Sequence, residues 1–520
     1  MSTPRTGASG IGTQGLSTQG FSAKFLSRDF TASIVVFLVA MPLCMGIALA
    51  SGVPPERGLI TGMIGGIIVG ALAGSPLQVS GPAAGLAVIV FEIVRDQGLS
   101  ALGPILILAG AIQVVAGVFR LGGMFRAISP AVVHGMLAGI GVLIVAGQFH
   151  VLFDAKPLPG GLQNLAAMPA RLLGLTPGSG AGTLPAFLIG LVTIGAMLGW
   201  EKFRPGMLRL VPGALIGVLV ATMVAIVAGM DVARVQVPES IGSAIAFPDA
   251  GFLSLFLEPT IILTALAIAF IASAETLLSA AAVDRMHDGV RTDYNKELRA
   301  QGVGNLLCGA VGAIPMTGVI VRSSANVQAG AMTRLSAILH GVWILAFVAL
   351  LPWLLREIPM ASLAGILVVT GWRLVSVGHV RHLFQLYGTL PLLVWAATLI
   401  MVVATDLLTG VLVGIGLSLV ELVPHIRTLR LKIDEPAGGD VPELALDGAA
   451  TFITLPKLIA RLDALPATGR MRLNLERLVH IDHTCAEMLH DWVKRRRDMG
   501  SAVEVTGAAG RFERLVTTPA

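Results

Sequence analysis

Two apolar stretches of this 520-residue chain are interrupted by glycine and proline in similar ways. Gly81 and Pro82 stand just before one apolar run, and Pro315 and Gly318 stand just before another. Because proline is favoured in the first turn of a helix, each motif predicts a helix that begins there. A helix start presents free N–H groups and about half a positive elementary charge, so two starts that face each other would attract an anion. Kinks in otherwise continuous helices are the alternative interpretation.

Charged side chains also occur inside the apolar stretches. Glu275 lies well within one, where a buried carboxylate is costly unless it is protonated or paired. Ser279 follows four residues later, on the same helical face. Glu275 is therefore a candidate to bind a proton, or to coordinate sodium with Ser279 and Thr317; a hydrogen-bonded brace is the alternative. Arg322 follows the second helix start and would balance Glu275, strengthen the field on an anion, or anchor the helix at the cytoplasmic face.

The composition places these residues in a membrane protein. Hydrophobic residues make up 55% of the chain, charged residues only 13%, and the mean hydropathy is +0.83. Soluble domains usually carry about twice that charged fraction. Apolar windows able to cross a hydrocarbon core, which takes about 20 residues per helix, lie near residues 31–50, 57–74, 82–95, 101–119, 130–152, 183–200, 208–230, 259–283, 295–313, 318–330, 333–353, 361–377, 389–405 and 407–424.

These windows fall into two sets of seven, separated by a polar stretch at residues 231–258. An odd number of spans gives the two halves opposite orientations, which predicts an α-helical polytopic membrane protein built as a 7+7 inverted repeat. The transmembrane domain is expected at residues 29–426, with repeats at about 29–230 and 250–426. Both glycine and proline motifs fall in equivalent windows, the third and the tenth. Interrupted spans paired in this way indicate a transporter substrate site near the middle of the bilayer.

The basic residues predict the orientation in the membrane. With the N-terminus inside, the inward loops gather most of the Lys and Arg, as the positive-inside rule requires. This predicts an integral protein of a bacterial-type inner membrane with both termini cytoplasmic and a disordered N-terminal tail at residues 1–28. These topology signals explain the formal charge of +5, so nucleic-acid binding is not expected. The inward-loop residues are Arg120, Arg126, Lys202, Arg204, Arg209, Arg285, Arg291, Lys296, Arg299, Arg373 and Arg381.

A soluble domain is predicted at residues 437–520, because charges return after Pro424. Strands alternate with helices there, which predicts a small cytoplasmic α/β fold. Asp482 or Thr484 would cap the second helix of this domain, and regulatory phosphorylation of Thr484 is the alternative role for that hydroxyl. The strands are expected at residues 443–446, 471–475 and 502–505, and the helices at residues 455–465 and 484–499.

No constellation of residues indicates enzyme chemistry. The three cysteines are scattered along the chain, which favours packing roles. No Ser/His/Asp set, metal-ligand cluster or nucleotide loop has the context that it requires. We therefore expect neither an enzyme nor a bound cofactor.

Several segments together resemble the SulP family of anion transporters, whose members carry a C-terminal STAS domain. Residues 40–59 are similar to the family's opening signature, a proline and a helix of small residues followed by a Gly-x-Pro-Pro-x-x-Gly-Leu turn. The helix of Glu275, residues 295–305 and the second helix start recur in family order. Residues 481–484 are similar to the STAS pattern, although Cys485 stands where the family often has glycine.

The resemblance implies that a core domain moves against a gate domain in an elevator-like cycle, with an anion held between the third and tenth helix starts. It implies Glu275, Ser279 and Arg322 as ion-coupling residues. It also implies a homodimer and a STAS domain that mediates dimerisation or binds a regulatory protein. The substrate-binding residues would be Pro42, Ser80, Gly81, Ala83, Ala84, Met316, Thr317 and Gly318.

Secondary active transport of bicarbonate or sulfate, coupled to protons or sodium, is the leading hypothesis. Sodium-coupled bicarbonate carriers of the family place Asp where this chain has Glu275, which makes proton coupling the more attractive. Exchange of dicarboxylates or chloride is the alternative within the family. A nucleobase permease shares the inverted repeat but lacks a STAS tail, and a signalling protein would not need fourteen spans to anchor a STAS module.

Overall fold

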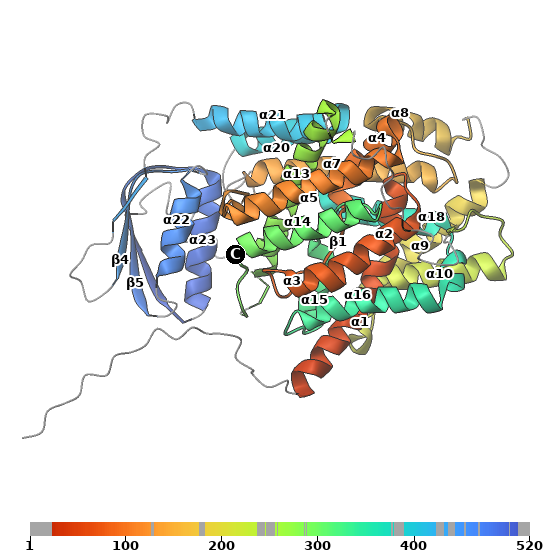
Figure 1. Ribbon diagram of the computed structural model, residues 1–520, viewed down its shortest axis with the longest axis horizontal. Helices are drawn as coiled ribbons and strands as arrows, with labels where there is room; N and C mark the ends of the chain where they lie inside the picture. Colours follow the sequence, from red (N-terminus) through yellow and green to blue (C-terminus); the bar gives the residue numbers. More distant parts are fainter. Residues whose placement is uncertain are drawn as a thin grey trace, which may run out of the picture.

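The computed structural model describes most of the chain. A bundle of helices forms the larger part, and a smaller unit of strands and helices lies at one end of it (Figure 1). The described residues are 23–125, 129–175, 183–236, 245, 255–256, 258–284, 286–287, 289–375, 378, 389–422, 431–434, 442–451, 454–465, 469–498 and 500–507.

The first half of the bundle runs from the N-terminal helix to residue 227. Its second span is not a uniform α-helix, because a π-helical stretch, η1, lies between α2 and α3. The elements are α1 (Ala23–Ala50), α2 (Pro55–Met63), η1 (Ile64–Val69), α3 (Gly70–Leu72), β1 (Ser80–Pro82), η2 (Ala84–Leu86), α4 (Ala87–Gln97), η3 (Leu99–Ala101), α5 (Leu102–Val118), α6 (Gly122–Phe125), α7 (Pro130–Val151), α8 (Gly161–Leu172), α9 (Thr183–Phe203), η4 (Gly206–Leu208) and α10 (Gly213–Val227).

The second half of the bundle repeats the pattern of long helices around one interrupted span. A short strand again precedes a short helix, at the place that corresponds to β1 and α4. The elements are α13 (Pro259–Asp284), α14 (Tyr294–Ala310), β2 (Met316–Gly318), α15 (Ile320–Gln328), α16 (Leu335–Leu350), α17 (Pro352–Arg356), α18 (Met360–Val375), α20 (Thr389–Ala404) and α21 (Leu407–Leu422).

Every one of the fourteen predicted windows contains a helix, so the predicted helical membrane fold is confirmed. Among the described residues, five helices are long and apolar enough to cross a bilayer, and five shorter apolar helices accompany them. Two details differ from the expectation. Helix α1 begins at Ala23, inside the tail predicted at residues 1–28, and α8 is an additional helix between the fifth and sixth windows.

Close backbone packing fixes α14 against α5. A Cβ on Gly110 would lie 2.5 Å from the nitrogen of Leu306, and one on Gly302 would lie 2.7 Å from the oxygen of Gly110. Only glycine permits this approach, as is common where helices associate in lipid. Helices α14 and α5 therefore form one tightly packed pair.

The C-terminal unit is a four-stranded sheet with strand order β3-β4-β5-β6. Strand β3 pairs with β4 antiparallel, whereas β4 with β5 and β5 with β6 pair parallel. Two helices cover the same face of the sheet (Figure 1), and leucine side chains with Trp492 fill the core between them. The elements are β3 (Leu431–Asp434), β4 (Glu443–Ala450), α22 (Leu455–Ala464), β5 (Arg470–Ile481), α23 (His483–Asp498) and β6 (Ala502–Thr506).

The predicted α/β alternation is confirmed, and one strand extends it. Strand β3 lies before residue 437, where the domain was expected to begin. The prediction missed this strand because its residues stand among charged residues that were interpreted as a linker. Asp482 caps α23 as predicted, since its Oδ1 accepts a hydrogen bond of 2.8 Å from the backbone N–H of Cys485. The side chain of Thr484 lies outside the described residues.

Candidate functional site

The two interrupted spans meet inside the bundle. Strands β1 and β2 pair antiparallel, with Ser80 opposite Gly318, Gly81 opposite Thr317 and Pro82 opposite Met316. Both strands are buried throughout, and β1 lies among the central helices (Figure 1). The two motifs are therefore not kinks in continuous helices. They form one small sheet of two segments more than 200 residues apart in the chain.

A helix follows each strand almost at once. Ala83 and Val319 are extended residues that stand directly before η2 and α15, and α4 continues from η2. Helices that begin at a buried strand pair place their N-terminal N–H groups in the interior. These N–H groups stabilise a nearby anion. The backbone N–H of Gly318 donates to Oγ1 of Thr276, and that of Val319 donates to the oxygen of Val79.

Arg322 lies in the first turn of α15 and brings a positive charge to the edge of this sheet. Its side chain is 0% exposed, and none of its three guanidinium nitrogens has a hydrogen-bond partner in the described part of the chain. Nη1 faces Gly81, because a Cβ added to that glycine would lie only 2.1 Å from it. The buried thiol of Cys44 and the imidazole of His340 lie close to this charge. The thiol is a weak acceptor at best, and it makes no hydrogen bond of good geometry with the guanidinium.

Glu275 lies beside the other strand of the pair, β2, at Thr317. Its carboxylate interacts with Thr317 and with the backbone N–H of Gly85. A Cβ added to Gly85 would lie 2.6 Å from Oε1 and 2.9 Å from Oε2, so only glycine leaves room for the carboxylate. Within the described residues, Oε2 of Glu275 and Oγ of Ser279 lack a hydrogen-bond partner. Oγ1 of Thr317 lies beside the carboxylate but makes no hydrogen bond of good geometry with it. Arg322 is not among the groups that act on Glu275 there.

The sequence-predicted residues thus divide into two groups around one sheet. Arg322 stands by Gly81, and Glu275 stands by Thr317. Pro42 is buried within α1, which packs against β1 and α15. The remaining predicted residues belong to the strands or the helix start: Ser80, Gly81, Met316, Thr317 and Gly318 in the sheet, buried Ala83 after β1, and partly exposed Ala84 at the start of η2.

Several amides that support the strands were not singled out from the sequence. Gln301 donates to Oγ of Ser80 at 2.5 Å, and Asn305 bonds both backbone groups of Met316. Gln78 donates to the oxygen of Thr276 at 3.0 Å. A signal for two of them exists in the sequence, because Gln301 and Asn305 are spaced by one helical turn inside an apolar window.

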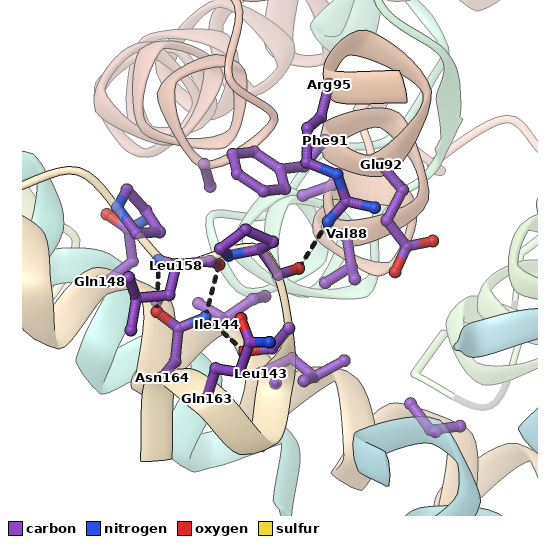
Figure 2. A pocket seen from close by; sticks show the side chains of 18 of the residues that line it. Val88, Phe91, Glu92, Arg95, Leu143, Ile144, Gln148, Leu158, Gln163 and Asn164 are labelled. Atoms are coloured by element: carbon purple, nitrogen blue, oxygen red, sulfur yellow. Dashed lines mark hydrogen bonds between the residues drawn. The ribbon is translucent and has the colours of Figure 1, made fainter. Parts of the chain in front are cut away.

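A cavity of about 340 Å³ runs along α4. Its lining extends from Arg95 near the end of the helix to Ala87 in its first turn, so it leads toward the helix start at the sheet. Figure 2 shows Glu92 and Arg95 on one side and Gln148, Gln163 and Asn164 on the other. Arg95 also donates from Nη1 to the oxygen of Pro159 at 2.7 Å, which links α4 to the loop before α8.

No group of three or more His, Cys, Asp or Glu side chains able to hold a metal ion occurs among the residues that the structure describes.

The sequence matches the family model described as the sulfate permease family over residues 26–398, which include both strands, Glu275 and Arg322. The chain belongs to the sulfate permease family. The Bacillus subtilis protein named "Putative sulfate transporter YvdB" is 33% identical over 406 residues, which cover 76% of this chain and 73% of that protein. The Synechocystis protein named "Bicarbonate transporter BicA" is 23% identical over 527 residues, which cover 94% of this chain and 89% of that protein.

Solved structures of the same fold agree with this membership. The transmembrane domain of a cyanobacterial bicarbonate transporter, BicA, matches with a TM-score of 0.61 at 22% identity and covers 75% of this chain and 98% of that one. The overall structure of SLC26A9 matches with a TM-score of 0.67 at 15% identity and covers 95% of this chain and 86% of that one. The helical membrane fold of this family member is therefore that of known anion-transport domains.

Proposed function

We propose that this sulfate permease family member is a secondary active transporter of a small inorganic anion, either bicarbonate or sulfate. The anion binds between the starts of α4 and α15, against the strands that contain Ser80, Gly81, Met316, Thr317 and Gly318. Family membership and the printed names of its relatives support this class of substrate.

The observation that carries the proposal is the state of Arg322. A fully buried guanidinium without hydrogen-bond partners is costly, because a desolvated charge needs a counter-charge or several acceptors. Nothing acidic among the described residues interacts with it, and it stands beside two helix starts, which also favour negative charge. An oxyanion at Gly81 supplies the missing acceptors. Its planar or tetrahedral oxygens suit the donor fork of arginine.

The coupling ion binds at Glu275, beside β2, whereas the anion binds at Arg322, beside β1. Glu275, Ser279 and Thr317 offer three oxygen atoms that make no hydrogen bond of good geometry in the described part of the chain, which suits either a proton on the carboxylate or a sodium ion among the oxygens. Because Thr317 belongs to β2, an ion at Glu275 and an anion at Gly81 would touch the same two-stranded sheet. This shared sheet gives a physical route for coupling, and the longer Glu side chain favours the proton.

The proposal includes the setting of the cycle. The helices around the sheet act as a core domain that moves against a gate domain in an elevator-like manner, in a bacterial-type inner membrane with both termini cytoplasmic. The C-terminal unit acts as a STAS domain that supports a homodimer and can bind a regulatory protein. Dicarboxylate or chloride exchange is the alternative within the family, and a membrane-anchored STAS signalling protein is the distant one.

The test is uptake into liposomes that contain the purified protein. Labelled sulfate, bicarbonate, chloride and fumarate are compared under imposed sodium and proton gradients. We expect uptake of sulfate or bicarbonate, and a loss of about tenfold or more in Arg322→Ala, since a hydrogen bond to a charged group contributes about 1.5–3 kcal/mol. Arg322→Lys retains the charge but not the fork, and Arg209→Ala, at an exposed position, is the control. Absence of transport for every anion contradicts the proposal.

A further inference from the structure

One face of α14 contacts both strands of the sheet. Glu297, Gln301 and Asn305 are spaced four residues apart, so they lie in one row along the helix. All three side chains are 0% exposed. We call this row the polar stripe. Two of its members, Gln301 and Asn305, make hydrogen bonds to β1 and β2.

Asn305 takes the place of a neighbouring strand for β2. In an antiparallel pair, only alternate residues turn their N–H and C=O groups toward the partner. Val319 donates to Val79, so the alternation turns the backbone groups of Gly318 and Met316 away from β1. Met316 donates to Oδ1 of Asn305 at 2.9 Å and accepts from its Nδ2 at 3.2 Å. One side-chain amide thus satisfies both groups.

Gln301 contacts β1 through a side chain rather than through the strand backbone. Its Nε2 donates to Oγ of Ser80 at 2.5 Å and to Oε1 of Glu297 at 3.0 Å. The other carboxylate oxygen of Glu297 accepts from the backbone N–H groups of Gly74 and Ser75 at 2.8 and 2.9 Å. The segment that leads into β1 is therefore fixed to α14 at two levels, before the strand and within it.

The stripe also reaches the helix that bears Glu275. Nδ2 of Asn305 donates to Oε1 of Gln113 on α5 at 2.8 Å, and Nε2 of Gln113 donates to Oγ of Ser273 on α13 at 3.2 Å. Since α5 and α14 are packed backbone to backbone at Gly110 and Gly302, this network has little freedom to shift. It joins β1, β2 and α13 through buried hydrogen bonds.

We infer that Gln301 and Asn305 are positioning residues, which set the distance and angle between the two strands and hence between the helix starts that bind the anion. This assignment rests on the proposed function and assigns no direct contact with the anion. Removal of the Asn305 amide leaves the buried N–H and C=O of Met316 without partners, so β2 has to move to find others. The affinity for the anion then falls although Arg322 and Glu275 are unchanged.

The experiment compares two asparagines on the same helix. Asn305→Ser removes the amide at the strand, and Asn295→Ser removes a single hydrogen bond to the backbone of Gly122 at the far end of α14. Uptake of labelled sulfate and bicarbonate is measured against concentration for protein that elutes as one folded species. We expect the KM of Asn305→Ser to rise tenfold or more, with the maximum rate within about threefold of wild type, and the KM of Asn295→Ser to stay within twofold.

A double variant separates positioning from general destabilisation. Gln113 touches β2 only through Asn305 in the described network, so Asn305→Ser with Gln113→Leu should have the KM of Asn305→Ser alone. Gln113→Leu by itself should raise KM to a smaller extent. If Asn305→Ser is not recovered as a folded protein, the KM of Gln113→Leu tests the assignment instead. Unchanged KM in a folded Asn305→Ser or Gln113→Leu overturns the assignment. Failure of the proposed function is a different result, since wild type would then transport no anion.

Discussion

Arg322 and Gly81 are in contact across two interrupted spans, and the contact depends on the missing side chain of the glycine. Nη1 of Arg322 would lie only 2.1 Å from a Cβ at position 81. The guanidinium therefore reaches the strand backbone itself, at the place proposed for the anion. The following predictions start from this arrangement and from the groups around it.

Gly81→Ala should remove most of the transport activity. The added methyl group takes the space of Nη1, so Arg322 has to turn away from the site or β1 has to shift. We expect uptake of the preferred anion to fall at least tenfold while the protein remains folded. Gly195→Ala is the matched control, because a Cβ there meets nothing within 4 Å. Transport by Gly81→Ala at the wild-type rate would show that the guanidinium does not act at this position.

Glu275→Gln should uncouple transport from its driving ion. Glutamine has nearly the same shape but neither holds a negative charge nor binds a proton at physiological pH. We expect uptake to lose its dependence on the imposed proton or sodium gradient, measured in liposomes with each gradient alone. Glu258→Gln changes an exposed carboxylate just before the same helix and should retain the dependence. An unchanged response in Glu275→Gln removes the coupling role.

Removal of the C-terminal unit should spare transport. The described contacts around the proposed anion site all lie between α1 and α16, and β3 begins the separate sheet. A chain that ends after residue 430 therefore lacks the whole sheet, whereas one that ends after residue 436 retains β3 without its partner. We expect the shorter chain to keep uptake within about threefold of full length and the longer one to aggregate more readily, as judged by size-exclusion chromatography. Loss of uptake with a folded shorter chain would favour the signalling alternative.

The thiol of Cys485 should react slowly with maleimides in the native protein. Burial raises the pKa of this thiol well above its ordinary value, and the carboxylate of Asp482 raises it further. The reactive thiolate forms only above the pKa, so little is present from pH 7 to pH 8.5. Peptide mapping by mass spectrometry should show slow labelling across this range and rapid labelling after denaturation. Equal rates in both states would mean that the core of the C-terminal unit is open.

The sequence alone predicted much of the fold and the main polar residues. Fourteen apolar windows, their division into two sets of seven and the C-terminal α/β unit follow from hydropathy and periodicity, which depend on neighbouring residues only. The two helix starts were recognisable because glycine and proline restrict the backbone locally. Glu275 and Arg322 stood out because a charge in an apolar window is rare.

Tertiary structure decided which of these parts meet. No local pattern shows that β1 pairs with β2, that Arg322 turns to Gly81 while Glu275 faces Gly85, or that Asn305 completes the edge of β2. These contacts join residues far apart in the chain, and that of Asn305 also depends on the packing of α14 against α5. The sequence determines the local energies of charges, glycines and helices, whereas the pairing of distant groups follows only from the one packing that satisfies all of them together.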